Sequence, residues 1–263
     1  MWQHQPVKFG LFHITFIVLS AFFLALAIFF GYRFQEPERK KKRDLILTLS
    51  GLFLDTWEIG TIISKAILHI ADWTLVPLQL CSTALLILPL PYFLKEGKIK
   101  DCVFGYLAFI RTAAGIAYFV NPTTIYNQPY IAESIHSGVY HRVIIATGTF
   151  TFFSQKRYTK KGLRSYFLGF PLFVAFSVRA VIGNTLALHF DPKTNVDYFF
   201  LRPKGPITIP ILDTLVKPRV PFATYYFLYL ACFFAIGFVP YGVFSLVNLI
   251  IAKAEERQNK VSA

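Results

Sequence analysis

Apolar residues fall in long blocks along the chain, and short charged stretches separate these blocks. A block of about 20 predominantly apolar residues is long enough to cross a bilayer as a helix. The pattern predicts helices at about 9–32, 45–68, 74–94, 102–120, 135–154, 166–190 and 221–250. We therefore expect an all-α, polytopic membrane protein, a seven-transmembrane-helix bundle that forms a single transmembrane domain over residues 1–263.

The composition agrees with a membrane protein. The chain is 55% hydrophobic, holds 29 phenylalanines and has a mean hydropathy of +0.50. Its first apolar block is too long for the central region of a signal peptide, so we interpret it as a retained anchor. The longest connection, 191–220, is about thirty residues and leaves no room for a separate soluble domain.

Charge predicts the orientation in the membrane. The net charge of +13 would suggest nucleic acid in a soluble protein, but here 17 Lys and Arg residues gather in the tail and in the loops after the first, third and fifth helices, against 6 on the other side. The positive-inside rule then puts the N-terminus outside and the C-terminus in the cytoplasm. The basic run 33–43 is interpreted as a topology signal that touches anionic lipid head groups.

Six charged residues lie inside the predicted spans, where an ionisable group usually has a partner or a function, and four of them form the predicted network. Asp55 and Glu58 belong to the second helix, Arg111 to the fourth and Arg179 to the sixth. At about 1.5 Å per residue, all four reach similar depths, which predicts a buried ion network. Two interpretations stay open: the network joins the helices, or its two arginines grip a substrate phosphate by paired hydrogen bonds.

The stretch VPLQLC at the head of the third predicted helix suggests chemistry. Cys81 lies about 10 Å, and His141 of the fifth helix about 9 Å, below the outer end of its helix. An imidazole can take the thiol proton, and the thiolate can then attack an ester carbonyl. This depth is where the esters of glycerophospholipids lie. The alternative, an inert packing cysteine, is common in apolar helices and stays open.

Neighbouring residues suggest further roles. Pro77 loosens the first turn of the third helix, and Gln79 is placed to orient a developing oxyanion. His136 is either a second base or an interfacial residue without chemistry. Cys102 and Cys232 are interpreted as packing residues. The histidines show no i,i+3 or i,i+4 pair for a metal or haem, so we expect no metal site and no cofactor.

Three stretches together resemble the YwaF-type family of bacterial integral membrane proteins, whose relatives include an animal transmembrane acyltransferase that moves fatty acyl chains between phospholipids. They are VPLQLC, NPTTIYNQP with the His141 helix after it, and NVDYFFLRPKGP. The resemblance covers about 75–245. It implies a polytopic bundle in a bacterial cell membrane, with Cys81 as nucleophile and His141, or alternatively His136, as its partner. Where many bacterial members have histidine, this chain has Gln79.

The resemblance also draws attention to the outer loop that contains Asn195, Tyr198 and Pro203. Its aromatic pair, Phe199-Phe200, would either fold over the mouth of the bundle as a lid or form part of an interfacial aromatic belt. Asn121-Pro122, in the other long outer loop, is typical of a turn.

These features favour a membrane-embedded acyltransferase or acyl hydrolase that acts on glycerophospholipids through a Cys–His thioester mechanism. Membrane phospholipids would then be its partners, and we expect no nucleic acid. The alternative is a non-enzymatic seven-helix transporter or binding protein that uses the network of Asp55, Glu58, Arg111 and Arg179. A structural membrane component is the third hypothesis.

Overall fold

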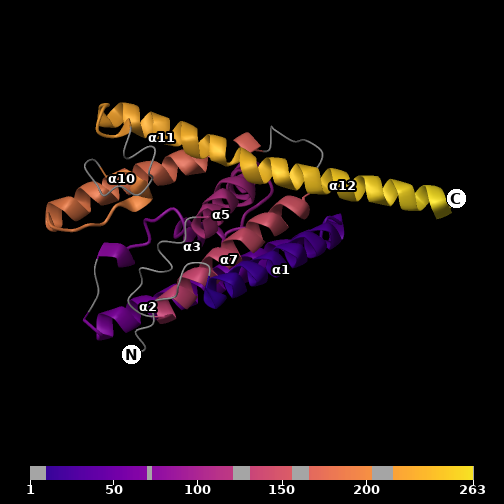
Figure 1. Ribbon diagram of the computed structural model, residues 1–263, viewed down its shortest axis with the longest axis horizontal. Helices are drawn as coiled ribbons and strands as arrows, with labels where there is room; N and C mark the ends of the chain where they lie inside the picture. Colours follow the sequence, from indigo (N-terminus) through magenta and orange to yellow (C-terminus); the bar gives the residue numbers. More distant parts are fainter. Residues whose placement is uncertain (1–9, 70–72, 121–130, 156–165, 203–215, 263) are drawn as a thin grey trace.

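The structure of the chain is a computed structural model that describes residues 10–69, 73–120, 131–155, 166–202 and 216–262. These residues form helices and no strand, which confirms the all-α class. The helices are α1 Leu11–Arg33, α2 Lys40–Ile67, α3 Thr83–Ile87, α4 Lys98–Gly105, α5 Thr112–Val120, α7 Ile131–Phe153, α10 Phe170–Phe190, α11 Phe222–Ile236 and α12 Phe238–Ser262 (Figure 1). Short helical turns are η1 Pro37–Arg39, η2 Trp73–Leu75, η3 Tyr106–Arg111 and η4 Tyr198–Phe200.

Several helices are long and apolar enough to cross a membrane. In the described part of the chain there are four: His13–Arg33, Pro37–Ile67, Phe170–Phe190 and Phe222–Gln258. The predicted helices that correspond to α1, α2, α7 and α10 are confirmed, with ends that differ by no more than five residues. Four candidate spans fit an integral membrane protein, while the count of seven and the orientation stay predictions.

The prediction of a helix over 74–94 is wrong. After η2, residues 76–82 are not helical, α3 covers only Thr83–Ile87, and turns follow it. Prolines explain both interruptions. A proline disfavours helical geometry in the residue before it and removes a backbone donor, and Pro77, Pro89 and Pro91 flank the short helix.

The last predicted helix, 221–250, is also corrected. Gly237 interrupts it between α11 and α12, and α12 continues to Ser262. A Cβ atom on Gly237 would lie 2.5 Å from the hydroxyl oxygen of Tyr166, so this residue must stay small. Three residues later, Pro240 has no N–H to donate to the carbonyl of Ile236, and the ladder of helical hydrogen bonds is broken there.

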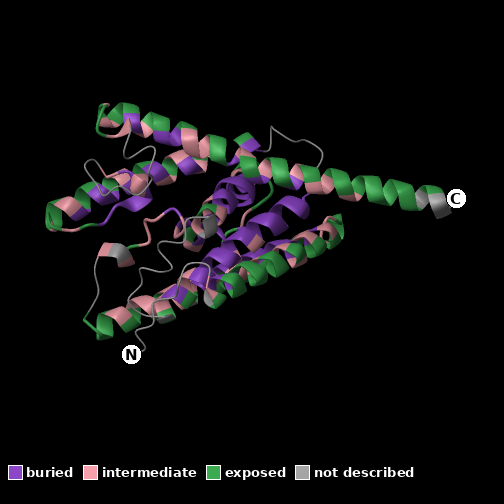
Figure 2. Cartoon of the chain, in the orientation of Figure 1, coloured by how far each residue is buried: buried purple, intermediate pink, exposed green. Residues whose placement is uncertain are grey.

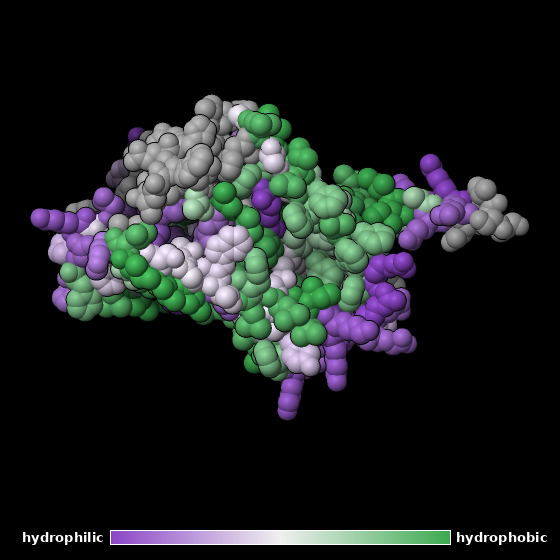
Figure 3. All heavy atoms as spheres, turned by 90° about the horizontal axis from the view of Figure 1, so that it is seen from below, coloured by the Kyte–Doolittle hydropathy of each residue, from purple (hydrophilic) through white to green (hydrophobic). Residues whose placement is uncertain are grey.

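Helix α7 lies at the centre of the bundle. It packs along α1 and also contacts α2, α5 and η3. In Figure 2, α7 and the α4–α5 region are largely buried, whereas the outer faces of α1 and α12 are exposed. Many exposed side chains are apolar, such as Phe22 (57% exposed) and Leu246 (57%). The face in Figure 3 is apolar across its middle and hydrophilic towards its ends, as a lipid-facing surface would be.

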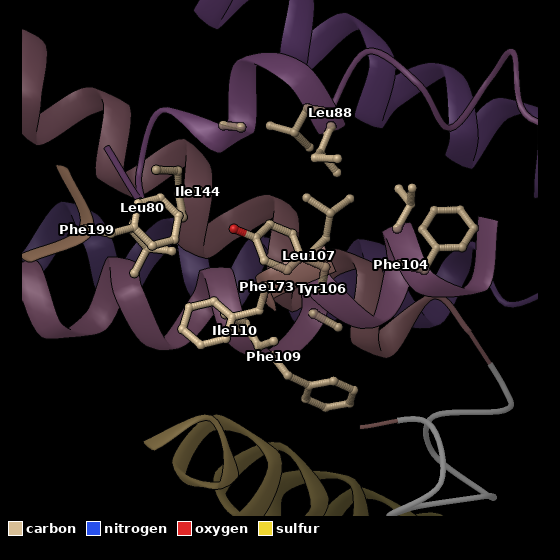
Figure 4. Close-up of a cluster of buried hydrophobic side chains, with 14 of the residues drawn as sticks. Leu80, Leu88, Phe104, Tyr106, Leu107, Phe109, Ile110, Ile144, Phe173 and Phe199 are labelled. Atoms are coloured by element: carbon tan, nitrogen blue, oxygen red, sulfur yellow. The ribbon is translucent and has the colours of Figure 1, made fainter. Parts of the chain in front are cut away.

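A π-helical turn interrupts the path from α4 to α5. This turn, η3, comprises Tyr106–Arg111, and each of its six residues is at most 1% exposed. Apolar side chains from α7, α10 and the segment before α3 surround it, among them Ile144, Phe173 and Leu80 (Figure 4). A π turn shifts the register of the following side chains and is frequent at functional sites. It therefore sets the direction of its last residue, Arg111.

Gly148 of α7 allows the close approach of this helix to the π turn. A Cβ atom there would lie 1.9 Å from Thr112 Oγ1 and 2.6 Å from the carbonyl oxygen of Leu107. We predict that Gly148→Ala lowers the melting temperature of the detergent-purified protein, because overpacking of this kind costs about 1–3 kcal/mol. Gly60→Ala is the matched control, since no atom lies within 4 Å of its Cβ position. Equal melting temperatures for the two variants would contradict the close contact.

Candidate functional site

Residues 76–82, here called the cysteine loop, carry Cys81 in a non-helical segment between η2 and α3. The backbone carbonyl of Cys81 accepts two hydrogen bonds from other helices. Arg111 Nη2 donates one and Tyr140 Oη donates the other, each at 3.2 Å. Within a membrane, non-helical backbone is tolerated only where protein or water satisfies its polar groups. The two side chains therefore supply what the missing helical hydrogen bonds would have supplied.

Further contacts fix the N-terminal end of the loop. Arg179 Nη2 of α10 donates a hydrogen bond of 3.3 Å to the carbonyl of Pro77. The hydroxyl of Tyr198 donates to the carbonyl of Trp73, just before the loop. The loop is thus held from η3, α7, α10 and η4, so the position of Cys81 is determined by tertiary contacts.

Arg111 is the central charged group of the site. Its side chain is 1% exposed and interacts electrostatically with Cys81, Tyr106 and Tyr140. Only its Nη2 makes a hydrogen bond within the described residues, and Nε and Nη1 are buried without a partner there. A buried cation with two unpartnered nitrogen atoms is costly unless an anion or a polar ligand meets it. The arrangement suits binding of developing negative charge.

His141 is held in a defined orientation. The ring is 7% exposed, and its Nδ1 lies 2.7 Å from the carbonyl oxygen of Ser137, one turn earlier on α7. A carbonyl can only accept, so Nδ1 carries the proton and the lone pair lies on Nε2. The ring of Tyr118 stacks on the imidazole at 3.5 Å, and its hydroxyl donates to Ser137 Oγ. His141 therefore has the tautomer that a general base needs.

The structure brings Cys81 and His141 to the same group of residues. Both interact electrostatically with Arg111, and Tyr140, the neighbour of His141, binds the carbonyl of Cys81. No hydrogen bond joins the thiol to the imidazole in the described part of the chain. Catalytic hydrogen bonds often form only when substrate is bound, so this geometry is compatible with the predicted pair.

The predicted ion network of Asp55, Glu58, Arg111 and Arg179 is not what the structure shows. No ion pair joins these acids to these arginines within the described residues. Glu58 Oε2 instead lies 3.2 Å from His136 Nε2, and Asp55 Oδ1 is buried without a hydrogen-bond partner there. The two arginines bind backbone carbonyls of the cysteine loop instead, because these carbonyls have no helical donors.

The contact with Glu58 also separates His136 from His141. The ring of His136 lies 5.7 Å from that of Trp57, so it packs against α2. A second ion pair, Lys65 with Glu133 at 2.9 Å, joins the same two helices. His136 thus helps to fix α2 to α7, which makes His141 the better candidate for the base.

Two other expectations concern Gln79 and metals. Gln79 lies in the cysteine loop, two residues before Cys81, and its side chain makes no hydrogen bond with the described residues. In the same part of the chain, no three His, Cys, Asp or Glu side chains are grouped so that they could hold a metal ion.

The segment around η4, which contains Tyr198 and Phe199, is buried against α10. Asn184 of α10 binds both backbone groups of Tyr198: its Oδ1 accepts from the N–H at 2.8 Å, and its Nδ2 donates to the carbonyl at 3.0 Å. Phe199 is 1% exposed and stacks with Phe173 at 6.2 Å between ring centres. Burial of this ring favours the lid interpretation over the lipid-facing belt. Asn195, in the same segment, is exposed.

Phe199 and Phe200 have φ angles of 55° and 58°. This left-handed geometry is uncommon for bulky residues and persists only where surrounding contacts impose it. Here the amide of Asn184 and the bond from Tyr225 Oη to the carbonyl of Phe200, 3.1 Å, provide such contacts. The rest of the motif, Pro203 included, and the predicted turn at Asn121-Pro122 lie outside the described residues.

Sequence reasoning missed three positioning residues: Tyr140, Tyr118 and Asn184. Tyr140 had a usable signal, because a loop freed by Pro77 needs donors and this tyrosine precedes His141 at the same depth. Tyr118 and Asn184 gave none, since an aromatic or amide side chain in an apolar helix is usually a packing residue.

Comparison with known proteins assigns a family. A family model described as the TMEM164 family matches residues 8–240, most of the chain. This is a different family from the YwaF type, so the predicted assignment was wrong. The bacterial membrane expected from it stays a prediction. No curated protein and no solved structure matches the chain.

The position of Arg111 predicts the reactivity of Cys81. In a Cys102→Ser/Cys232→Ser background, we expect Arg111→Gln to slow alkylation of Cys81 by iodoacetamide about tenfold or more, because a nearby cation favours the thiolate. Mass spectrometry of the modified peptide gives the rate. Arg111→Lys should retain most of it, since it keeps the charge.

Arg179→Gln is the matched control. It removes a donor to the same loop, at Pro77, without a direct electrostatic interaction with Cys81. Equal slowing in Arg111→Gln and Arg179→Gln would show that loop geometry alone, and not the charge of Arg111, governs the thiol.

Proposed function

We propose that this chain, which belongs to the TMEM164 family, is a membrane-embedded enzyme that transfers or hydrolyses acyl chains of glycerophospholipids through a thioester on Cys81. One observation carries the proposal. The cysteine lies in a loop clamped by Arg111, whose Nε and Nη1 lack partners within the described residues. His141, with a free Nε2, interacts with the same guanidinium.

The first half-reaction forms the thioester. Nε2 of His141 takes the proton of the Cys81 thiol, and the thiolate attacks the ester carbonyl of a glycerophospholipid. The carbonyl oxygen becomes an oxyanion, which the free N–H groups of Arg111 stabilise in a water-poor site. When the ester C–O bond breaks, His141 returns its proton to the departing glycerol oxygen. A lysophospholipid leaves, and the acyl chain stays on Cys81.

The second half-reaction releases the acyl chain. A hydroxyl of a second lysophospholipid, or a water molecule, gives its proton to His141 and attacks the thioester carbonyl. The C–S bond breaks, and Cys81 recovers the proton from His141. The acceptor alone decides between transfer and hydrolysis, since both outcomes use the same residues.

The remaining site residues receive supporting parts. Arg179 and Tyr198 already donate to carbonyls at Pro77 and Trp73, so we assign them to positioning the loop. Gln79 is free to meet the oxyanion beside Arg111. Asn195, exposed in the outer segment, is assigned to the head group.

We also propose seven passes, with the N-terminus outside. Beyond the four candidate spans, α7 has 23 residues, and α4, η3 and α5 follow one another over eight, six and nine residues. Each of these two paths is about 34 Å long, enough for a bilayer core. The broken segment from η2 to α3 would be the seventh pass, and the cysteine loop would lie in the outer leaflet.

Acyl transfer tests the proposal. We expect the purified chain in nanodiscs to move a labelled fatty acyl group from a diacyl phospholipid to a lysophospholipid, with a hydroxylamine-sensitive acyl-enzyme trapped on the way. Cys81→Ala should abolish both signals. His141→Asn should lower the rate about 10²–10⁴-fold, the usual contribution of a general base.

Cys102→Ala and Cys232→Ala are the matched controls and should keep full activity. Label on Cys102 or Cys232, or unchanged transfer in Cys81→Ala, would exclude the mechanism. Solute counterflow that survives Cys81→Ala and is lost in Arg111→Ala would instead identify a transporter.

A further inference from the structure

A cavity of about 390 Å³ opens at the N-terminal end of α2. Its charged lining consists of Lys40, Lys41, Asp44, Lys95, Glu96 and Lys100. These residues come from the first turns of α2 and α4 and from the turn before α4. We call this cavity the lysine pocket.

The two carboxylates of the lysine pocket are already occupied. Glu96 lies 2.8 Å from Lys40 and 2.9 Å from Lys100. Asp44 lies 2.5 Å from Lys100 and 2.9 Å from Arg43. Each acid thus has two cationic partners, and the lysines are held in place around the cavity.

Glu96 stays ionised in this setting. Burial alone would raise its pKa, but hydrogen bonds from Lys40 and Lys100 lower the pKa overall. The carboxylate therefore keeps its charge at neutral pH and continues to hold these two lysines.

Two lysines remain available. Lys41 and Lys95 are exposed, and neither has an ion-pair partner within the described residues. Four lysines against two carboxylates leave the lining with a net charge of +2. The lysine pocket is therefore complementary to a small dianion.

The surroundings place the pocket at the level of lipid head groups. Tyr92, Phe93 and Ile99 stand beside the lysines and are 49%, 72% and 71% exposed. Exposed aromatic and apolar side chains next to lysines are typical of the membrane–water interface. Glu58 interacts electrostatically with Cys81, and on α2 it lies fourteen residues, about 21 Å, from Asp44 of the lysine pocket. The lysine pocket is therefore separate from the Cys81 site.

We propose that the lysine pocket binds a phosphate monoester, through Lys41 and Lys95 with Lys40 and Lys100 behind them. Lysine acts on phosphate as a point charge, and the doubly charged monoester matches the lining. The location favours a lipid such as phosphatidic acid over a soluble phosphate. This site stands whether or not Cys81 is catalytic.

Binding of short-chain phosphatidic acid to the detergent-purified full chain tests the proposal by thermophoresis. Lys41→Gln/Lys95→Gln should weaken binding about tenfold or more, since each lysine near a membrane anion contributes measurably. Glu96→Gln, which removes a competing carboxylate, should strengthen it. Lys253→Gln/Arg257→Gln makes the same charge change in the exposed end of α12 and should alter binding less than about twofold.

Competitors identify the source of the phosphate. Displacement by glycerol 3-phosphate as effective as that by the lipid supports the site and assigns it a soluble ligand, whereas displacement by the lipid alone assigns it a lipid. Two results would overturn the proposal: binding of phosphatidylcholine as strong as that of phosphatidic acid, or equal weakening by the α12 control pair. Unchanged melting temperatures confirm that the variants are folded.

Discussion

The hydrogen bonds that Arg111 and Tyr140 donate to the carbonyl of Cys81 are the interaction on which the site depends. Prolines remove the helix from this part of an apolar chain, and the freed carbonyls cannot be left to lipid. Thr83 contributes to the same end: its hydroxyl donates to the carbonyl of Leu80 at 2.7 Å and lies 2.8 Å from Tyr106 Oη. A reactive group on a non-helical loop is therefore compatible with membrane depth.

The π turn follows from the same requirement. Arg111 is its last residue, and a regular helix would direct the guanidinium elsewhere. The turn leaves the carbonyl of Leu107 to accept from the hydroxyl of Thr112 at 3.1 Å, and Gly148 allows α7 to close on both. The π turn between α4 and α5 thus directs Arg111 to a carbonyl that the non-helical cysteine loop leaves without a helical partner.

Sequence reasoning located most helices but not the site geometry. Apolar block lengths predicted α1, α2, α7 and α10, because the bilayer requires that length whatever the tertiary contacts. The prediction of a helix over 74–94 was wrong, because prolines interrupt the helix in spite of its apolar sequence. Depth put Arg111 at one level with Asp55, Glu58 and Arg179, but in the structure Arg111 binds the carbonyl of Cys81 instead of these acids. Spacing gives the level of a residue, whereas the backbone carbonyls that compete for its N–H groups are invisible in a sequence.

Buried charge around Asp44 and around Cys81 differs in kind, and the difference bears on the proposal for Cys81. In the first group, Asp44 pairs with both Lys100 and Arg43, and all three are buried. Pairing offsets the cost of their desolvation, so they stabilise the fold. Around Cys81, the guanidinium of Arg111 is equally buried, but its Nε and Nη1 have no partner in the described residues. Such a buried, partly unpaired cation usually has a function, such as binding a ligand that supplies the missing partner. Incomplete pairing at Arg111 is thus the stronger argument for a substrate-binding site than burial of the charge itself.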